Sequence, residues 1–225
     1  MHEKKVAVSW SGGKDCCLAL YRMLQENKNV ACLVSMVSEN DARNHAHGIK
    51  LEILRLQAEA LGLPLILVDS AGDYERSLIN SLTQLKDQHG IEEIAFGSLY
   101  AGEDRKWNEE VAYKSGLAPL FPVWISPEVS SKLLKDFISL GFSAVVCRAS
   151  VKNFDRTWPG RMLDLSFFEE IQKQDICVMG EFGEYHTFVL DGPIFQKKVS
   201  LTESRVVLNS GLWSLDISQC QLVEK

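Results

Sequence analysis

A glycine-rich bend near the start of the chain restricts the possible fold more than any other feature. The apolar run 6–10 is followed directly by Ser11-Gly12-Gly13-Lys14-Asp15. The glycines let backbone N–H groups turn toward an anion, and a helix beginning near Asp15 directs the positive end of its dipole to the same place. Lys14 adds a full positive charge. The bend therefore predicts a strand, a phosphate-binding loop and a helix, with the phosphate chain of a nucleotide as ligand.

Residue spacing excludes two common nucleotide-binding loops. A Walker loop has a glycine five residues before its Gly-Lys pair and a hydroxyl residue after it, but these positions hold Val8 and Asp15. A dinucleotide fingerprint needs a third glycine, and none follows Gly12 and Gly13 at the required distance. The remaining Ser-Gly-Gly-Lys-Asp loop resembles that of the ATP pyrophosphatase (PP-loop) superfamily, whose members cleave ATP between its α and β phosphates. A tight strand-to-helix turn without a ligand is the alternative.

Composition favours a cytoplasmic globular protein. The chain has 225 residues, and its 46% hydrophobic content is sufficient for a buried core. No stretch approaches the roughly 20 apolar residues of a membrane span, so we expect no membrane partner. The net charge of −6 argues against broad nucleic-acid binding. The six cysteines form no C-x-x-C pair and are expected to be reduced thiols.

The first half of the chain alternates between strand and helix patterns. This alternation predicts a parallel sheet whose ligands lie beyond the carboxyl ends of the strands, where loops 11–15, 38–47 and 97–105 converge. Expected strands cover 6–10, 30–37, 65–68 and 94–96, and expected helices cover 15–25, 49–61 and 74–88.

The pattern changes near Ile125, where we place a domain boundary. Beyond it we expect helices near 127–140 and 166–173, and strands at 144–147, 185–190, 205–208 and 212–217. The predicted fold is α/β: a Rossmann-like parallel sheet with helices on both faces, followed by a smaller mixed α+β domain. The domains are expected at 1–125 and 126–225.

A second polar cluster lies in the segment 180–193. Glu181, Glu184 and His186 surround glycines there. Such groups can position a polar substrate or move protons, because histidine titrates near neutrality and a glutamate can be tuned toward it. A glycine turn that leads into an edge strand would have the same composition, and the residues alone do not separate the two interpretations.

This segment and the opening loop together resemble the diphthine–ammonia ligase family of PP-loop ATPases. Members of that family carry Gly-Glu-x-Gly-Glu-Tyr, then Thr-Phe-Val and Asp-Gly-Pro. The resemblance covers nearly the whole chain and implies a Rossmann-like (HUP-type) nucleotide-binding domain followed by a smaller substrate domain. Further matches are His47-Gly48, 57–65, Gly97 with Arg105 and Glu109, 122–124, and Trp158 with 160–161.

The resemblance implies an ATP-dependent amide ligase that adenylates a carboxylate, transfers ammonia, and releases AMP and pyrophosphate. Its implied cofactors are ATP and Mg²⁺. Its implied partners are ammonia and a carboxylate substrate such as diphthine on elongation factor two, and a homodimer stays open. The expected catalytic residues are Lys14, Asp15, Glu181, Glu184 and His186, with Asp15 also a metal ligand. Expected ATP contacts are Ser11, Gly12, Gly13, Lys14, Asp15, Cys16, Ser38, His47, Gly97 and Arg105, and expected substrate contacts are Glu109, Trp158, Arg161, Gly183, Tyr185 and Thr187.

Two departures from the family pattern leave the substrate open. Cys16 stands where the superfamily loop usually has Ser or Thr, and a thiol is a weak hydrogen-bond donor to phosphate. His186 stands in a Tyr-His-Thr sequence that differs from the Tyr-Glu-Thr of eukaryotic and archaeal ligases and resembles bacterial relatives. Because bacteria lack diphthamide, another acyl substrate is an alternative.

Other functions also stay open, as do purely structural roles for some of these residues. RNA thiolation would use Cys147 or Cys177 as sulfur carrier, and a non-catalytic ATP-binding protein would need no polar cluster at 180–193. Arg105 and Glu109, four residues apart, fit either a surface ion pair or a phosphate contact. His45 and His47 could share a metal, although two histidines in a polar loop are more often solvated or in contact with substrate.

Overall fold

The computed structural model describes residues 3–38, 40–70 and 72–225. Residue 39, in the polar loop expected at 38–47, therefore lies outside the described residues. By their contacts the described residues form two compact units. One unit contains 1–11, 15–45 and 63–124, and the other contains 12–14, 46–62 and 125–225. Residues 12–14 of the glycine loop thus pack with the C-terminal part of the chain.

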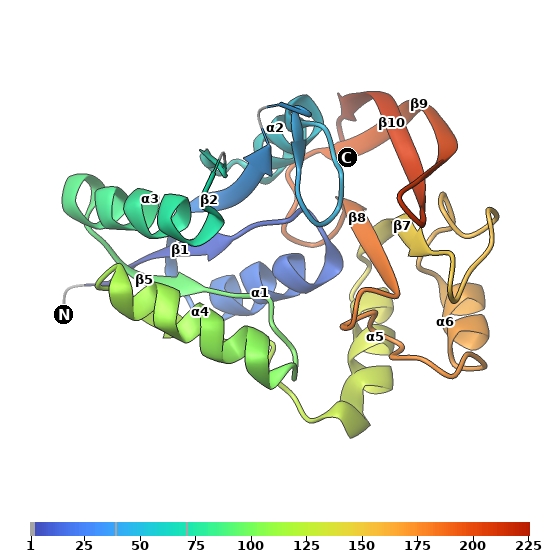
Figure 1. Ribbon diagram of the computed structural model, residues 1–225, viewed down its shortest axis with the longest axis horizontal. Coiled ribbons are helices and arrows are strands. Elements are labelled where there is room, and N and C mark those ends of the chain that lie inside the picture. Colours follow the sequence, from blue (N-terminus) through green and yellow to red (C-terminus); the bar gives the residue numbers. More distant parts are fainter. Residues whose placement is uncertain (1–2, 39, 71) are drawn as a thin grey trace. The chain divides into compact units, whose positions relative to one another are not determined.

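The first unit is built on a parallel sheet, as predicted (Figure 1). Strand β1 (Lys5–Ser9) lies between β2 (Asn29–Ser38) and β5 (Ile91–Ala95), and it runs parallel to both. Strand β4 (Leu65–Asp69) pairs with β2, and β6 (Ala118–Leu120) pairs with β5. The chain thus continues to one side of β1 through β2 and to the other through β5. A sheet with this order places a ligand crevice at the carboxyl ends of β1 and β5.

A short strand interrupts the polar loop that was expected without regular structure. Strand β3 (Arg43–Asn44) pairs antiparallel with the end of β2, where Val37 and Ser38 are its partners. This pairing holds Asn44 in a buried position although its side chain is polar.

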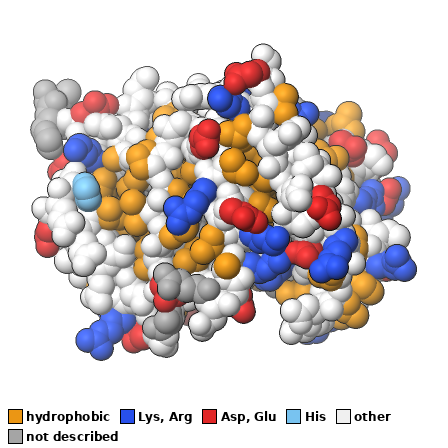
Figure 2. Space-filling view, turned by 90° about the horizontal axis from the view of Figure 1, so that it is seen from above, with side chains coloured by type: hydrophobic (Ala, Val, Ile, Leu, Met, Phe, Trp, Pro, Cys, Tyr) orange, Lys and Arg blue, Asp and Glu red, His pale blue; other side chains and the backbone are white. Residues whose placement is uncertain are grey.

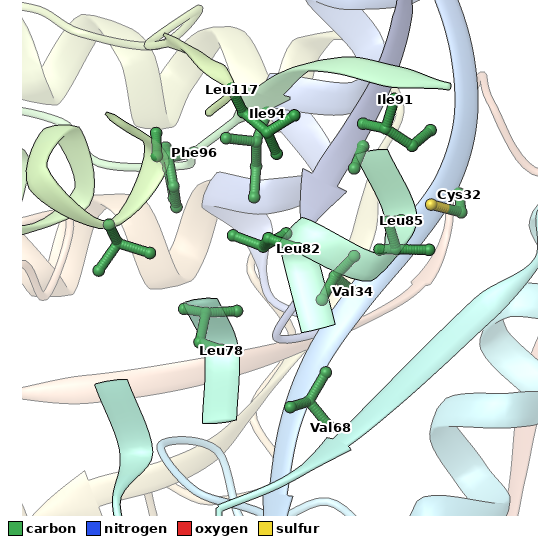
Figure 3. Packing of buried hydrophobic residues seen from close by; sticks show 13 residues of the cluster. Cys32, Val34, Val68, Leu78, Leu82, Leu85, Ile91, Ile94, Phe96 and Leu117 are labelled. Atoms are coloured by element: carbon green, nitrogen blue, oxygen red, sulfur yellow. The ribbon is translucent and has the colours of Figure 1, made fainter. Parts of the chain in front are cut away.

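Helices α3 (Tyr74–His89) and α4 (Gly102–Lys114) pack against this sheet. Leu78, Leu82 and Leu85 lie on one face of α3 at helical spacing and are buried against strand residues such as Val34 and Ile94 (Figure 3). The side chain of Asp73 caps α3 by accepting a hydrogen bond from the backbone N–H of Arg76 at 3.0 Å. Helix α1 (Lys14–Gln25) begins directly after the glycine loop.

The second unit contains a four-stranded antiparallel sheet in the order β8-β7-β10-β9. Its strands are β7 (Ser143–Ser150), β8 (Tyr185–Asp191), β9 (Lys198–Asn209) and β10 (Leu212–Val223). Its helices are α2 (Leu51–Leu61), a 3₁₀ turn at Pro127–Val129, α5 (Ser130–Ser139) and α6 (Leu165–Ile171). The predicted fold class, a parallel α/β sheet with helices followed by a C-terminal domain of mixed structure, is confirmed.

The outer hairpin is longer than the sequence predicted. Strands β9 and β10 extend well beyond the expected 205–208 and 212–217, because the two strands also pair with one another over 198–204 and 218–223. On the face shown in Figure 2, Lys and Arg side chains lie among Asp and Glu side chains with apolar atoms between them. Within the described ranges, no helix combines the length and the apolar character needed to cross a membrane.

Candidate functional site

Residues 12–14 of the glycine loop are attached to β8 by direct hydrogen bonds. The backbone N–H of Val189 donates to the carbonyl oxygen of Gly12 at 2.9 Å. The side-chain amide of Gln57, which is fully buried on α2, donates to the same oxygen at 3.0 Å and to the carbonyl oxygen of Val189 at 2.7 Å. The N–H of Lys14 donates to the hydroxyl oxygen of Thr187 at 3.0 Å. The loop conformation is therefore fixed by α2 and β8.

Glycine is required at Gly12 for two reasons. Its φ of 83° lies in the left-handed region, which side chains rarely adopt. A Cβ atom there would also lie 2.8 Å from the side-chain oxygen of Gln57.

His47 lies against the same loop. Its Nδ1 lies 2.8 Å from the backbone carbonyl oxygen of Thr187, and because a carbonyl only accepts, Nδ1 carries the hydrogen. Nε2 is then the acceptor nitrogen of a neutral ring. The rings of His47 and His186 have centroids 4.9 Å apart. A Cβ at Gly13 would lie 2.5 Å from Cε1 of His47, so the glycine makes room for the imidazole.

Four basic side chains gather here: Lys14, His47, Arg148 and His186, which we call the basic cluster. Burial lowers the pKa of His47 well below its usual value, and His186, Lys14 and Arg148 lower it further, against the opposing effect of its hydrogen bond to Thr187. Burial, followed by the positive charges of Lys14 and Arg148, lowers the pKa of His186 to about 4. Both imidazoles are neutral at pH 7 and are held beside two cations, an arrangement that favours an anion.

Two contacts position the cations of the cluster. Lys14 is only 2% exposed, and its Nζ lies 5.2 Å from the centroid of the Tyr185 ring. Arg148 donates from Nη1 to the carbonyl oxygen of Ala46 at 2.8 Å. Its guanidinium also fills the space that a Cβ at Gly48 would need.

The first unit contributes a separate set of residues at the carboxyl ends of β1 and β5. Asn44 donates from Nδ2 to the carbonyl oxygen of Ser11 at 2.8 Å, and the Ser11 hydroxyl lies 3.5 Å from the sulfur of Cys16. A Cβ at Gly97 would lie 2.8 Å from the backbone nitrogen of Cys16 and 2.9 Å from the carbonyl carbon of Asp15. Gly97 therefore allows the chain after β5 to approach the start of α1 closely.

Arg105 is held over aromatic rings in the same unit. Its Nε lies 2.8 Å from Oε1 of Glu109, the ion pair at i and i+4 that the sequence left as one alternative. Its guanidinium carbon lies 4.6 Å from the centroids of both Phe121 and Trp124.

The Ser38 hydroxyl, at the end of β2, donates to Asp41 at 3.5 Å.

Glu184 organises the turn that precedes β8. Its Oε1 accepts from the backbone N–H of Cys177 at 3.1 Å, and its Oε2 accepts from the backbone N–H of Phe182 at 2.9 Å. Gly180 and Gly183 adopt φ values of 68° and 83° in this turn. Both carboxylate oxygens thus shape the turn, which leaves the Phe182 side chain 70% exposed.

Trp158 and Arg161 lie in an aromatic cluster. Trp158 is buried, with its ring centroid 4.3 Å from that of Phe154. Arg161 stacks 4.5 Å from the Trp158 centroid and pairs with Glu170 at 2.6 Å. Phe167 belongs to this cluster, and its ring lies 5.5 Å from that of Tyr185. The cluster therefore supports Tyr185, whose ring lies against Lys14.

The structure gives His45 and His47 different partners. His45 contacts the Ser70 hydroxyl, and its ring lies 5.5 Å from that of Tyr74. His47 contacts Thr187 and His186. Among the residues that the structure describes, no group of three or more His, Cys, Asp or Glu side chains is arranged to hold a metal ion.

The sequence analysis missed Gln57, Arg148 and Asn44 as site residues. Gln57 did leave a signal, because it occupies the apolar face of α2 with Ile53, Leu54 and Leu61, where a glutamine is out of place unless its amide is satisfied. Arg148 is a single basic residue in a strand, and the importance of Asn44 depends on the β2–β3 pairing. Neither leaves a comparable signal.

The chain is similar in sequence to named diphthine–ammonia ligases. The diphthine–ammonia ligase of Homo sapiens is 28% identical over 234 residues, covering 92% of this chain and 86% of that protein. That of Schizosaccharomyces pombe is 26% identical and covers 89% of this chain and 36% of its own length. A solved structure described as a predicted subunit of tRNA methyltransferase from Methanocaldococcus jannaschii aligns with a TM-score of 0.40 at 13% identity, covering 68% of this chain and 80% of that one.

Two family models match along the chain. The diphthamide synthase N-terminal domain matches residues 4–119. The diphthamide synthase C-terminal domain matches residues 129–223. Together they include the glycine loop, the basic cluster and the turn organised by Glu184, and the chain therefore belongs to the diphthamide synthase family.

Proposed function

We propose that this chain is an ATP-dependent amide ligase that adenylates a substrate carboxylate and transfers the acyl group to ammonia, releasing AMP and pyrophosphate. The basic cluster at residues 12–14 is the observation that carries the proposal, because the buried Lys14 and the partly buried Arg148 at a glycine loop suit a phosphate chain. The names of the relatives support diphthine as the acyl substrate, and the resemblance seen in the sequence adds elongation factor two as its carrier. We assign ATP binding to residues 1–125 and substrate binding to 126–225, in cytoplasmic surroundings.

The glycine loop and Lys14 would hold the β and γ phosphates. The α phosphorus would then be open to in-line attack by the carboxylate, with pyrophosphate as the leaving group. Ser11, Cys16, Ser38, Gly97 and Arg105 are the proposed further ATP contacts. Mg²⁺ would accompany ATP, held mostly by phosphate oxygens, with the carboxylate of Asp15 as the protein ligand. A single carboxylate fits this mode of Mg²⁺ binding, which needs no protein cage.

The structure supports different roles for the polar residues near β8. Glu184 shapes the turn through two backbone N–H groups and is therefore proposed as a positioning residue. We propose Glu181, a carboxylate of the same segment, as the acceptor of the proton that ammonia releases. Gly183, Tyr185, Thr187, Glu109, Trp158 and Arg161 would shape the substrate side, the last two through the packing under Tyr185.

RNA thiolation is less well supported. A sulfur carrier must form a thiolate, and burial raises the pKa of Cys147 to about 12. That thiol is a poor nucleophile at neutral pH.

Lys14→Met tests the proposed function. Methionine keeps an apolar side chain over Tyr185 but removes the charge, so we expect the fold to survive and AMP formation from ATP, ammonium and diphthine-bearing elongation factor two to fall by about 100-fold or more. Lys106→Met, at an exposed position on α4, is the matched control. Formation of ADP instead of AMP, or full AMP formation by Lys14→Met, would refute the proposal.

A further inference from the structure

Two neutral imidazoles lie in a cluster of cations. Phosphate binding by Lys14 alone does not explain why they are there. The His47 ring is anchored by its Nδ1 hydrogen bond, which leaves Nε2 as the nitrogen that can take a proton. The His186 ring lies beside it, with centroids 4.9 Å apart. The charged groups that act on the pair are Lys14 from α1 and Arg148 from β7.

We propose that the His47–His186 pair takes up a proton from solvent when the phosphate chain of a nucleotide binds to the basic cluster, and so adds a positive charge beside the departing pyrophosphate. This inference rests on the proposed function, since it concerns the same site. It assigns the pair a role that the loop and Lys14 do not fill.

The physical basis is that a bound phosphate chain reverses the sign of the electrostatic potential at the two histidine rings. In the free protein, each histidine must gain its charge in a partly buried position near Lys14 and Arg148, and both factors disfavour the imidazolium. A polyphosphate places several negative charges within the same cluster. Opposite charge at a few ångströms favours the protonated ring.

One proton is expected for the pair instead of two. The rings face one another, and His186 already disfavours the charged form of His47. Two adjacent imidazoliums would repel, so the two rings titrate as a coupled unit. The proton adds to a ring nitrogen on binding and returns to solvent, or leaves with pyrophosphate, when the product departs.

The coupling makes phosphate binding depend on pH with a defined sign. Because the bound form carries one proton more than the free form, nucleotide affinity rises as pH falls through the pKa of the bound pair. Between pH 8 and pH 6 we expect the wild-type affinity to rise by about three- to tenfold relative to a variant in which both rings are replaced by glutamine. The ionisation of the nucleotide itself is common to both proteins and cancels in this ratio.

Histidine NMR gives the direct test. The chain has five histidines, so each ring C–H signal can be assigned with single His→Gln variants. Spectra are recorded from pH 5 to 8 with and without an ATP analogue that carries a methylene bridge between the α and β phosphates. We expect the His47 and His186 signals to stay neutral throughout without nucleotide, and one proton's worth of titration to appear in the pair with nucleotide bound. His89, on α3, is the internal reference, and its signal should not change when the nucleotide analogue is added.

The outcomes separate this inference from the proposed function. If the analogue binds by equilibrium dialysis but the two signals stay neutral across the whole range, proton uptake is refuted while ATP binding stands. If the analogue does not bind at all, both are refuted. Protonation of His47 or His186 above pH 6 in the free protein would also overturn the inference, because no proton would then remain to be taken up.

Discussion

The side-chain amide nitrogen of Gln57 donates a hydrogen bond to the carbonyl oxygen of Gly12 at 3.0 Å. The same nitrogen donates to the carbonyl oxygen of Val189 at 2.7 Å, so one buried side chain connects α2, the glycine loop and β8. The loop and the strand that follows the Glu184 turn therefore share one support. A substitution at Gln57 should affect stability and nucleotide binding together.

Gln57→Leu keeps the size of the side chain but removes both hydrogen bonds. Because the Val189 carbonyl loses this buried donor, we expect the free energy of unfolding to fall by about 1–3 kcal/mol, and nucleotide affinity to fall with it. Denaturant unfolding and ATP titration measure the two effects. Gln88→Leu, at an exposed position of α3, is the control and should change neither. Equal ATP affinity in Gln57→Leu and wild type would show that the loop does not depend on this support.

Gly97→Ala tests the close approach of the chain after β5 to the start of α1. The added Cβ would lie 2.8 Å from the backbone nitrogen of Cys16, and backbone cannot rotate away as a flexible side chain can. We expect a loss of stability of about 1–3 kcal/mol, with weaker nucleotide binding, measured by thermal unfolding and ATP titration. Gly102→Ala is the matched control, because no atom lies within 4 Å of its Cβ position. Similar unfolding temperatures for the two variants would contradict the steric argument.

The elements that the sequence predicted well carry their own boundary signals. Helix α3 was expected at 74–88 and observed at Tyr74–His89, because Asp73 caps its start and Gly90 ends it in the left-handed conformation. The β9–β10 hairpin was predicted too short. Its missed parts, 198–204 and 218–223, contain mostly polar residues, and their strand conformation depends on the pairing of β9 with β10.

The candidate site was predictable only where a local motif marks it. The glycine loop and the 180–193 segment were visible in the sequence, whereas the role of Arg148 depends on the pairing of β7 with β8, in which Arg148 lies opposite His186. The two hydrogen bonds of Gln57 likewise depend on how α2 packs against β8. Such partners are set by tertiary packing between segments far apart in the chain, for which a single sequence carries no direct signal.

Glu184→Gln tests the assignment of this carboxylate to the turn. One of the two backbone N–H groups, of Cys177 or Phe182, would face an amide NH₂ that cannot accept its hydrogen. We expect faster hydrogen exchange at these two amides and slower turnover, with ATP affinity unchanged. Glu103→Gln, at an exposed position in the first turn of α4, is the control. Unchanged exchange in Glu184→Gln would mean that the carboxylate does not hold the turn.

The cysteines should differ in reactivity according to burial. Cys147 is buried and burial raises its pKa to about 12, whereas Cys177 and Cys220 are only partly buried. Under native conditions we expect a thiol reagent to label Cys177 and Cys220 well before Cys147, as measured by peptide mass spectrometry. Cys147→Ala should retain AMP formation. Loss of AMP formation in that variant, with the fold intact, would revive the thiol-based alternative.

The neutral histidines should make stability depend on pH. The folded-state pKa of His186 is about 4, below the 6.5 of an unperturbed histidine, so the unfolded state binds more protons between these values. The contribution of the neutral His186 ring to the free energy of unfolding is fully present above about pH 6.5. It is lost progressively as the pH falls toward 4. Each unit of pKa difference is worth about 1.4 kcal/mol, so between pH 6.5 and 5 this one residue should cost roughly 2 kcal/mol. His186→Gln removes the titrating group, and its free energy of unfolding should fall less over that interval than the wild type's. His89→Gln, exposed at the end of α3, should follow the wild-type curve. Parallel curves for His186→Gln and wild type would show that His186 is not held neutral by its surroundings.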